Sequence, residues 1–402
     1  MQQHLAILTY LIALLAATCQ TPAQTSRLSH DWPQWRGPNV DGISHEAGWD
    51  AANPRELWHA QVGPGHPAVS VVGDRAYTLG YRDSRDYVVC LNVASGETVW
   101  ETSYPSELFN TSHGGGPAGT PAVSNGKVYT ISRHGLLHCW NARNGKSLWQ
   151  RDLRKTLGVS PGSFGFTGSP VVHGNVVFID VGVVAAINRT TGALIWKTAN
   201  HGAGYSTPVP FKFRNRLLLA TFPAKGLIVI NVANQKLVAQ YPWTTYYDIN
   251  VATPIVSGTK IFISSGYNTG AALVELTPNG AKRVWQNKAM RNHMATCVLR
   301  DGKLYGFDEG QLKCMDLATG EPLWTQRGMG KGSLMLADGK LIIMTTKGEL
   351  VIAQASSEQY TELSRTKAVD SQDTWTMPVL SNGRIFCRSD KGDVACFDVS
   401  GK

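Results

Sequence analysis

The sequence predicts an all-β fold, namely an eight-bladed β-propeller built from four-stranded antiparallel blades. Three observations lead to this expectation. A strand-and-turn pattern recurs eight times along the chain, with a period of roughly 40 to 50 residues. In most copies a tryptophan follows the last tight turn at a near-fixed distance, as in Asn92–Trp100, Asn141–Trp149, Asn188–Trp196 and Asp316–Trp324. No amphipathic helical period of useful length follows the leader, which argues against Rossmann, TIM-barrel and helical solenoid folds.

The second repeat, residues 120–149, shows the elements of one blade most clearly. It contains four short strand patterns, and the second alternates apolar and polar side chains as a half-buried strand does. Three turn sequences separate them: Asn125-Gly126, Arg133-His-Gly135 and Arg143-Asn-Gly145. Four antiparallel strands joined by tight turns are the unit of a propeller.

The other repeats follow the same order, and the last one indicates how the ring closes. They span about Pro67–Trp100, Ser169–Trp196, Thr207–Val238, Thr253–Trp285, Thr296–Trp324, Ser333–Leu363 and Met377–Lys402. The eighth repeat lacks its fourth strand, and a matching strand pattern occurs at Pro54–Trp58. We therefore expect this N-terminal strand to complete the last blade, because closure removes an exposed strand edge.

The recurring tryptophans are expected to be structural. A large ring packed between neighbouring blades buries much apolar area and fixes the angle between them. A role in stacking a cofactor is not expected, because these residues recur as part of the scaffold. The docking residues are Trp58, Trp100, Trp149, Trp196, Trp285 and Trp324. The fourth repeat departs from the pattern, since Asn234-Gln235 replaces the turn glycine, and in the seventh Leu363 stands near the tryptophan position.

The N-terminus predicts export. Leu5–Ala17 is a 13-residue apolar run, shorter than the roughly 20 residues that span a bilayer, and it suits a secretory leader. We expect a signal peptide over 1–23, a tether and lead segment over 24–53, and the propeller over 54–402. The mature protein would be periplasmic or secreted, monomeric and without a transmembrane span. Cys19 leaves lipid anchoring open.

Charge and cysteine content exclude several classes. The net charge of +9 comes from scattered Lys and Arg residues with no run of five, so no nucleic-acid partner is expected. No cysteines form a C-x-x-C pair, so a zinc or haem site is not supported, and no metal is expected. Asp390–Asp393 resembles a two-residue hairpin turn, which would place Cys387 directly opposite Cys396 and allow a disulfide in an exported protein.

The repeat core Asp/Asn-x-x-Thr/Ser-Gly-x-x-x-Trp resembles the pyrroloquinoline-quinone-like (PQQ-like) β-propeller repeat, over about Pro54–Lys402. The segment Asp31–Gly42 resembles an N-terminal signature of exported bacterial members. The resemblance implies an eight-bladed ring, in agreement with the number of repeats. Many members bind no quinone, and the chain is distantly similar to one such branch, the propeller lipoprotein of the outer-membrane β-barrel assembly machinery.

Quinoprotein dehydrogenases resemble this chain in repeat type but carry further features that can be looked for in the sequence. Those enzymes stack the quinone between a tryptophan and a disulfide of two adjacent cysteines, and they hold calcium with a carboxylate and an amide. No Cys-Cys pair occurs here, and Asp248 and Asn250 are only loose candidates for calcium ligands. We therefore expect no cofactor, with PQQ and calcium as the alternative.

A candidate binding site lies at one mouth of the central channel. The residues just before each first strand should line this mouth, and they are rich in aromatic, histidine and amide groups. The candidates are His66, His113, Phe166, Tyr205, Tyr247, Asp248, Asn250, Asn292, His293, Lys331 and Trp375. Two interpretations stay open: these side chains bind a ligand, or they plug the channel and bond to water and backbone.

The expected function is a non-catalytic scaffold that binds a protein or small ligand through its rim loops and central funnel. A quinone-dependent oxidoreductase that uses the funnel is the alternative. The run His113-Gly-Gly-Gly116 resembles the oxyanion loop of esterases, but no Gly-x-Ser-x-Gly elbow accompanies it. No paired carboxylates at comparable loop positions favour a carbohydrate-acting enzyme.

Overall fold

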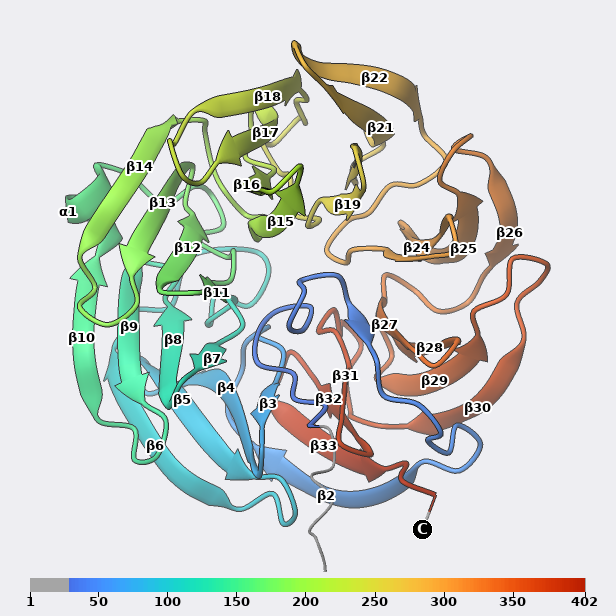
Figure 1. Cartoon of the computed structure of the whole chain (residues 1–402). Helices are drawn as coiled ribbons and strands as arrows, with labels where there is room; N and C mark the ends of the chain where they lie inside the picture. The colour runs from blue at the N-terminus through green and yellow to red at the C-terminus, as the bar shows by residue number, and fades with distance from the viewer. Residues whose placement is uncertain (1–28, 402) are drawn as a thin grey trace, which may run out of the picture.

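The chain forms a closed ring of eight antiparallel sheets around a central axis (Figure 1). The structure is a computed structural model that describes residues 29–401, so the predicted signal peptide and Cys19 lie outside the described residues. Each sheet contributes one four-stranded blade, as predicted, and one of the sheets carries an additional fifth strand. Helix is nearly absent from these residues, since α1 (Leu153–Leu157) has five residues and lies between the second and third blades.

The strands of each blade follow one another in sequence from the centre of the ring outwards. Blade 1 comprises β3 (Ser70–Val72), β4 (Arg75–Arg82), β5 (Arg85–Asn92) and β6 (Thr98–Pro105). Blade 2 comprises β7 (Ala122–Ser124), β8 (Lys127–Ile131), β9 (Leu136–Asn141) and β10 (Ser147–Asp152). Blade 3 comprises β11 (Val171–His173), β12 (Val176–Asp180), β13 (Val183–Asn188) and β14 (Leu194–Asn200). Blade 4 comprises β15 (Val209–Phe213), β16 (Arg216–Thr221), β17 (Gly226–Asn231) and β18 (Leu237–Pro242).

The second half of the ring repeats this order. Blade 5 comprises β19 (Ile255–Ser257), β20 (Lys260–Ser265), β21 (Gly270–Thr277) and β22 (Gly280–Asn287). Blade 6 comprises β23 (Val298–Arg300), β24 (Lys303–Asp308), β25 (Gln311–Asp316) and β26 (Pro322–Gln326). Blade 7 comprises β27 (Ser333–Ala337), β28 (Lys340–Met344), β29 (Glu349–Gln354) and β30 (Glu362–Lys367). Blade 8 comprises β31 (Val379–Ser381), β32 (Arg384–Arg388), β33 (Asp393–Asp398) and the N-terminal β2 (Arg55–Gln61).

The N-terminal strand closes the ring, as expected from the missing fourth strand of the last repeat. β2 pairs antiparallel with β33, with Glu56 opposite Phe397 and Trp58 opposite Cys396. The two ends of the propeller domain therefore share one sheet, and no blade edge is left open at the seam.

The repeating tryptophans lie between neighbouring blades. Trp58, Trp100, Trp149, Trp285 and Trp324 each donate the indole Nε1–H to a backbone carbonyl of the next blade, at 2.8 to 3.2 Å. Trp196 packs with residues of blade 4 in one apolar cluster. Burial of the ring together with a hydrogen bond at its polar end ties each blade to the next.

The turn before each tryptophan explains why the repeat requires asparagine and glycine. In blade 2 the side-chain oxygen of Asn141 accepts a hydrogen bond from the Arg143 backbone N–H at 2.9 Å. Gly145 has a φ of +68°, and its N–H donates to the Asn141 carbonyl. A Cβ on Gly145 would lie 2.6 Å from the Trp100 ring, so glycine leaves room for the indole of the preceding blade.

One expectation about the last hairpin is wrong. The register between β32 and β33 places Cys387 opposite Ala395, and Phe386 opposite Cys396. The turn holds three residues rather than two, with Gly392 at a φ of +89°. This one-residue difference puts the two cysteines on opposite faces of the sheet, and both are buried free thiols.

The lead segment, residues 29–50, crosses one face of the ring and contacts the innermost strand or adjoining loop of every blade (the blue trace at the centre of Figure 1). It bridges Trp32 to Val71 in an isolated pair, and it includes β1 (Ile43–Ser44), which lies parallel to β27. The contacts in blade order are Trp32–Val71, Pro33–Val123, Gln34–Val172, Val40–Val209, Trp35–Thr253, Arg36–Cys297, Ile43–Leu336 and His30–Ser381. The segment therefore closes the channel at this end.

The two faces of the ring differ in what they carry. We call one face the lead face, because it carries the lead segment. The turns that follow the first and third strands of each blade lie on this face. The loops between blades and the turns after the second strands lie on the opposite face, which we call the mouth face. Within residues 29–401, no helix has the length and apolar character needed to cross a membrane.

Candidate functional site

A cavity of about 130 Å³ lies at the mouth end of the central channel. The loops between blades supply most of its wall, because the antiparallel strand order brings all of these loops to one face. Trp35 of the lead segment also lines it, and its indole Nε1–H donates to the Thr253 hydroxyl at 3.0 Å. The cavity is thus a blind pocket rather than an open tunnel.

Five rings form a continuous aromatic wall along this cavity, which we call the aromatic arc: His66, Trp375, His113, Phe164 and Tyr205. His66 stacks on Trp375 with ring centroids 5.4 Å apart and planes at 15°. Trp375 meets the edge of His113 at 5.1 Å, and His113 stacks on Phe164 at 5.6 Å. Phe164 meets Tyr205 edge-on at 5.8 Å, so each ring supports the next.

The two histidines of the arc are neutral near pH 7. Burial lowers the pKa of His66 to about 4, and burial also lowers the pKa of His113. His66 Nε2 lies 3.0 Å from the His113 carbonyl, whereas its Nδ1 has no hydrogen-bond partner among the described residues. The Trp375 indole nitrogen is likewise buried without a partner in residues 29–401.

Arg133 supplies the one charged side chain that the described residues contribute to the cavity lining. Its guanidinium donates to the Gly116 and Phe164 carbonyls, which joins the two loops that carry His113 and Phe164. Burial lowers the pKa of Arg133 to about 10, so the group stays charged at neutral pH. No Asp, Glu or Lys side chain of this part of the chain lines the cavity. The site therefore offers flat apolar surfaces and a few donors, but no acid–base pair.

The structure sorts the predicted mouth residues into different roles. His66, His113, Tyr205 and Trp375 line the cavity as expected. Asn250 is fully buried, donates to the Pro223 carbonyl at 2.9 Å and accepts from the Ser265 hydroxyl at 2.8 Å. An amide whose bonds are satisfied within the fold holds loops in place and is not free for a ligand.

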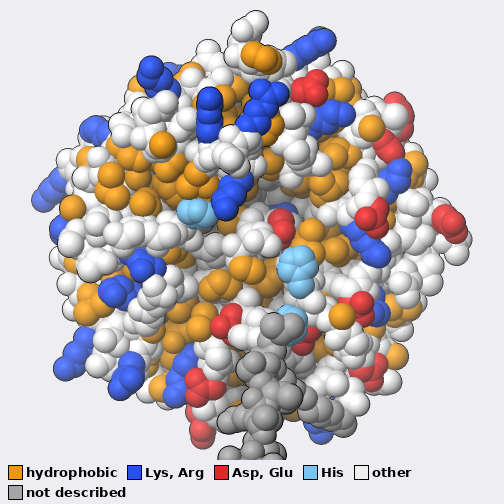
Figure 2. All heavy atoms as spheres, in the orientation of Figure 1, with side chains coloured by type: hydrophobic (Ala, Val, Ile, Leu, Met, Phe, Trp, Pro, Cys, Tyr) orange, Lys and Arg blue, Asp and Glu red, His pale blue; other side chains and the backbone are white. Residues whose placement is uncertain are grey.

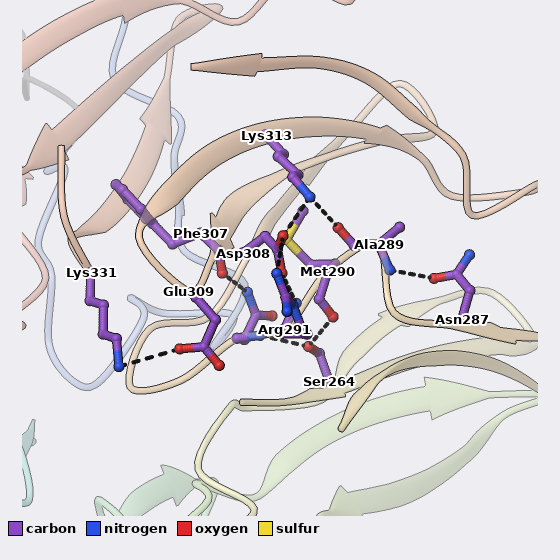
Figure 3. Close-up of polar contacts among 11 residues, drawn as sticks. Ser264, Asn287, Ala289, Met290, Arg291, Phe307, Asp308, Glu309, Lys313 and Lys331 are labelled. Carbon is purple, nitrogen blue, oxygen red and sulfur yellow. Dashed lines mark hydrogen bonds and ion pairs between the residues drawn. The ribbon is translucent and has the colours of Figure 1, made fainter. Parts of the chain in front are cut away.

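Asn292 has the same structural role in blade 6. Its side-chain amide donates to the Phe307 carbonyl at 3.0 Å, and its backbone N–H donates to the Ser264 hydroxyl at 2.9 Å. Nearby, Asp308 accepts from both Arg291 and Lys313 (Figure 3). Burial by itself raises the pKa of Asp308, but the hydrogen bonds from these two cations outweigh it, so the pKa is lowered. This buried ion cluster fixes the loop that carries Asn292.

His293 and Tyr247 belong to a second aromatic cluster on the rim rather than to the cavity. Tyr267 lies 4.5 Å from His293 and 5.5 Å from Tyr247, measured between ring centroids. Burial lowers the pKa of His293 to about 4. Tyr246 is 86% exposed beside Tyr247, so this loop presents aromatic surface to solvent.

The remaining predicted residues lie at the edge of the mouth or behind it. Asp248 is exposed in a turn with a φ of +55°. Lys331 pairs with Glu309 at 3.3 Å (Figure 3). Phe166 is buried behind the cavity, where it packs against Gly135. Phe164, two residues earlier, takes the place in the lining that was expected for Phe166.

Eleven of the fifteen lining residues were not predicted, among them Trp35, Arg133 and Phe164. Arg133 occupies a turn after a second strand, and such turns share the mouth face with the loops between blades. That topological signal was in the sequence. Trp35 had no such signal, because its position follows from the path of the lead segment across the ring.

Among the described residues no group of three or more His, Cys, Asp or Glu side chains lies close enough together to hold a metal ion. Calcium in particular is bound by six to eight oxygen atoms.

Comparison with known proteins places the chain among propeller proteins of differing function. It is 24% identical over 322 residues to outer membrane protein assembly factor BamB of Yersinia pestis, a match that covers 72% of this chain and 77% of that protein. It is 31% identical over 120 residues to quinoprotein alcohol dehydrogenase PedH of Pseudomonas putida, covering 29% of this chain and only 19% of that enzyme.

The solved structures support the fold. A europium-containing methanol dehydrogenase superposes with a TM-score of 0.71 at 12% identity, covering 89% of each chain. A likeness at this identity concerns the architecture alone. A family model, PQQ_2, described as outer membrane protein assembly factor BamB, matches residues 84–326. The chain therefore belongs to the PQQ_2 family of PQQ-like β-propeller proteins.

Proposed function

We propose that this protein is an exported, non-catalytic scaffold that binds a partner protein or small ligand at its mouth face. The observation that carries the proposal is the aromatic arc around a blind cavity with no carboxylate from the described residues in its lining. Apolar rings with a few orienting donors are typical of binding pockets. His66 and His113 are titratable, but the described residues place no carboxylate in the lining to pair with either ring.

The geometry argues against a quinone enzyme. Pockets for cofactor-sized ligands usually enclose about 300 to 1,000 Å³, whereas this cavity has about 130 Å³. His66 stacks on one face of Trp375 and His113 meets the indole edge-on, so less of the ring is open to a flat cofactor. In residues 29–401 no group of three or more His, Cys, Asp or Glu side chains occurs that could hold calcium.

Export is supported by the apolar leader predicted at the N-terminus and by the relatives. The Yersinia pestis protein is named as an outer membrane assembly factor. We infer that this chain is likewise exported, either free or anchored through Cys19.

The two functions separate in a cofactor-binding experiment. Purified protein would be incubated with PQQ and calcium, and quinone retention would be measured by absorbance together with alcohol-dependent dye reduction. We expect neither retention nor turnover. Quinone-dependent turnover that is lost in a Trp375→Ala variant would overturn the proposal.

Binding by the mouth face is tested by crosslinking in the native cell. A photo-crosslinking residue in place of exposed Tyr247 is expected to trap a discrete partner. The matched control places the same residue at Leu194, which is exposed after a turn on the lead face. Equal or absent crosslinking at the two positions would contradict a mouth-face partner.

A further inference from the structure

The positive charge of this chain is concentrated in one part of the ring. Residues 108–247 contain fourteen Lys and Arg residues but only two acidic ones, Asp152 and Asp180. Asp152 caps α1 and pairs with Arg154, and Asp180 is buried. Blades 2 to 4 are therefore almost without exposed acidic groups, a segregation that indicates an interaction with an anionic partner.

Six of these cations form what we call the basic sector: Arg143, Lys146, Lys212, Arg214, Arg216 and Lys236. All six are exposed, and all lie in or beside turns of the lead face in blades 2 and 4. Figure 2, in which the lead face is towards the viewer, shows Lys and Arg along the upper and left parts of the ring, whereas Asp and Glu gather at the right and below.

The basic sector is not neutralised by the protein itself. None of its six residues forms an ion pair with any residue in the range 29–401. On the same face of blades 6 and 7, by contrast, Lys303 pairs with Asp316 at 2.5 Å and Lys340 pairs with Asp338 at 2.8 Å. On the lead face the basic sector is thus unpaired, whereas these two cations of blades 6 and 7 are paired.

The repeat itself shows how this difference arises. Lys303 of β24 lies opposite Asp316 of β25, and the equivalent pair in blade 2 is Lys127 opposite Asn141. The turn accepts either Asp or Asn, because both side chains accept hydrogen bonds from the following backbone N–H groups. Blade 2 therefore has the neutral form where blade 6 has an acid, and Lys127 lacks the ion pair that Lys303 makes.

Aliphatic side chains lie beside these cations. Leu148, Ile195 and Leu237 follow the outer turns of blades 2, 3 and 4 and are 46%, 50% and 48% exposed. The turns of a propeller face are roughly coplanar, so they meet a flat surface together. Cations combined with exposed aliphatic groups on one flat face match an anionic lipid bilayer, whose headgroups attract the charge and whose acyl boundary accepts the apolar groups.

The path of the chain agrees with this orientation. The first described residues leave the ring on the lead face, where the His30 N–H donates to Asn382 at 2.9 Å and the Ser381 hydroxyl donates to the His30 carbonyl. A preceding segment attached to a membrane would hold this same face towards the lipid. From charge, shape and chain path, we propose that the lead face docks on an anionic phospholipid bilayer through the basic sector, independently of the mouth cavity.

The test compares vesicle binding by charge variants of the full chain. Flotation would be measured with vesicles of phosphatidylcholine mixed with an equal part of phosphatidylglycerol, and with phosphatidylcholine alone. We expect preference for the anionic vesicles and loss of that preference when salt is raised from about 0.1 M to about 1 M, where the screening length falls to roughly 3 Å.

The variant Lys212→Gln, Arg214→Gln, Arg216→Gln should reduce partitioning to anionic vesicles roughly a hundredfold, because each cation near such a surface contributes roughly fivefold. The control Lys225→Gln, Lys288→Gln, Lys347→Gln removes equal charge from exposed mouth-face positions and should bind like wild type. The predicted N-terminal leader is the same in all the variants, so it cannot account for a difference in binding between them.

Two outcomes would overturn the proposal. Equal losses of vesicle binding in both triple variants would mean that the net charge of the protein alone decides the binding. Wild-type binding that does not depend on lipid charge would point to an acidic protein as the partner. Circular-dichroism melting of each variant verifies that the ring is folded, so a loss of binding is read only from folded protein.

Discussion

The glycine of the turn before the docking tryptophan should be a sensitive position in the blades that have it, and Gly145 allows the clearest test. Its backbone is left-handed, with φ at +68°, and an added Cβ would lie 2.6 Å from the Trp100 ring. Trp100 would have to move away, although its indole donates to the Ala142 carbonyl at 2.9 Å. Gly145→Ala thus disturbs the junction between blades 1 and 2.

The expected cost has two parts. Left-handed backbone costs an alanine about 1 to 2 kcal/mol. Displacement of the indole adds about 1 kcal/mol for the hydrogen bond and about 1 to 2 kcal/mol for lost packing. Gly126→Ala isolates the first part, because Gly126 has a φ of +70° in the same blade and no described atom lies within 4 Å of the place that its Cβ would take.

The assay is urea unfolding followed by tryptophan fluorescence. Gly145→Ala should lower the free energy of unfolding by about 3 to 5 kcal/mol, from the sum of those terms, and Gly126→Ala by only about 1 to 2 kcal/mol. In a Trp100→Leu background the two glycine variants should cost nearly the same, because the clash is gone. Equal costs in the wild-type background would refute tryptophan docking as the reason for the glycine.

Three further predictions follow from buried groups. Burial raises the pKa of Asp180 to about 6, so the carboxylate destabilises the fold as pH rises through that value; Asp180→Asn should be more stable at pH 7.5 by at most about 3 kcal/mol, with the gain shrinking below pH 5 in urea titrations. Burial lowers the pKa of His293 to about 4, so stability should fall as pH drops from about 6.5 towards 4, and His293→Leu should flatten that profile, whereas an unchanged slope would contradict burial of a neutral ring. Arg36 is buried and donates to the Val40, Asp41 and Cys297 carbonyls; Arg36→Met should cost about 3 kcal/mol or more, and limited proteolysis should then cut residues 31–47 first, whereas unchanged resistance would show that these bonds do not hold the segment.

The fold was predictable because its determinants are local and repeated. Asn141 and Gly145 specify a turn within a few residues, and eight copies of the pattern fix the number of blades. Ring closure followed from counting strands in the last repeat. The hairpin register at Cys387 was not predictable, because two-residue and three-residue turns both accommodate Asp390-Lys-Gly392 and differ by one position.

The strand order predicts which loops meet at the mouth face, but it does not predict which of their side chains line the cavity. His66 and Trp375 come from loops that the strand order brings to the same face, so their meeting could be expected. Asn250 comes from an equivalent loop, but whether an amide turns inwards depends on the backbone carbonyls around it, here that of Pro223. Trp35 meets Thr253 across more than two hundred residues, and no local pattern encodes that contact.

The lead segment separates the two surfaces to which we assign binding, and this gives a test of whether they act independently. Trp35 contributes to the mouth cavity, while neighbouring residues of the same segment lie on the lead face. If the segment has one fixed position, Trp35→Ala should change binding at the mouth without changing vesicle binding, and the basic-sector triple variant should do the reverse. Their free-energy effects would then add, as expected for distant sites without shared partners. A measured coupling above about 0.5 kcal/mol would instead show that the segment shifts between two positions and transmits occupancy from one face to the other.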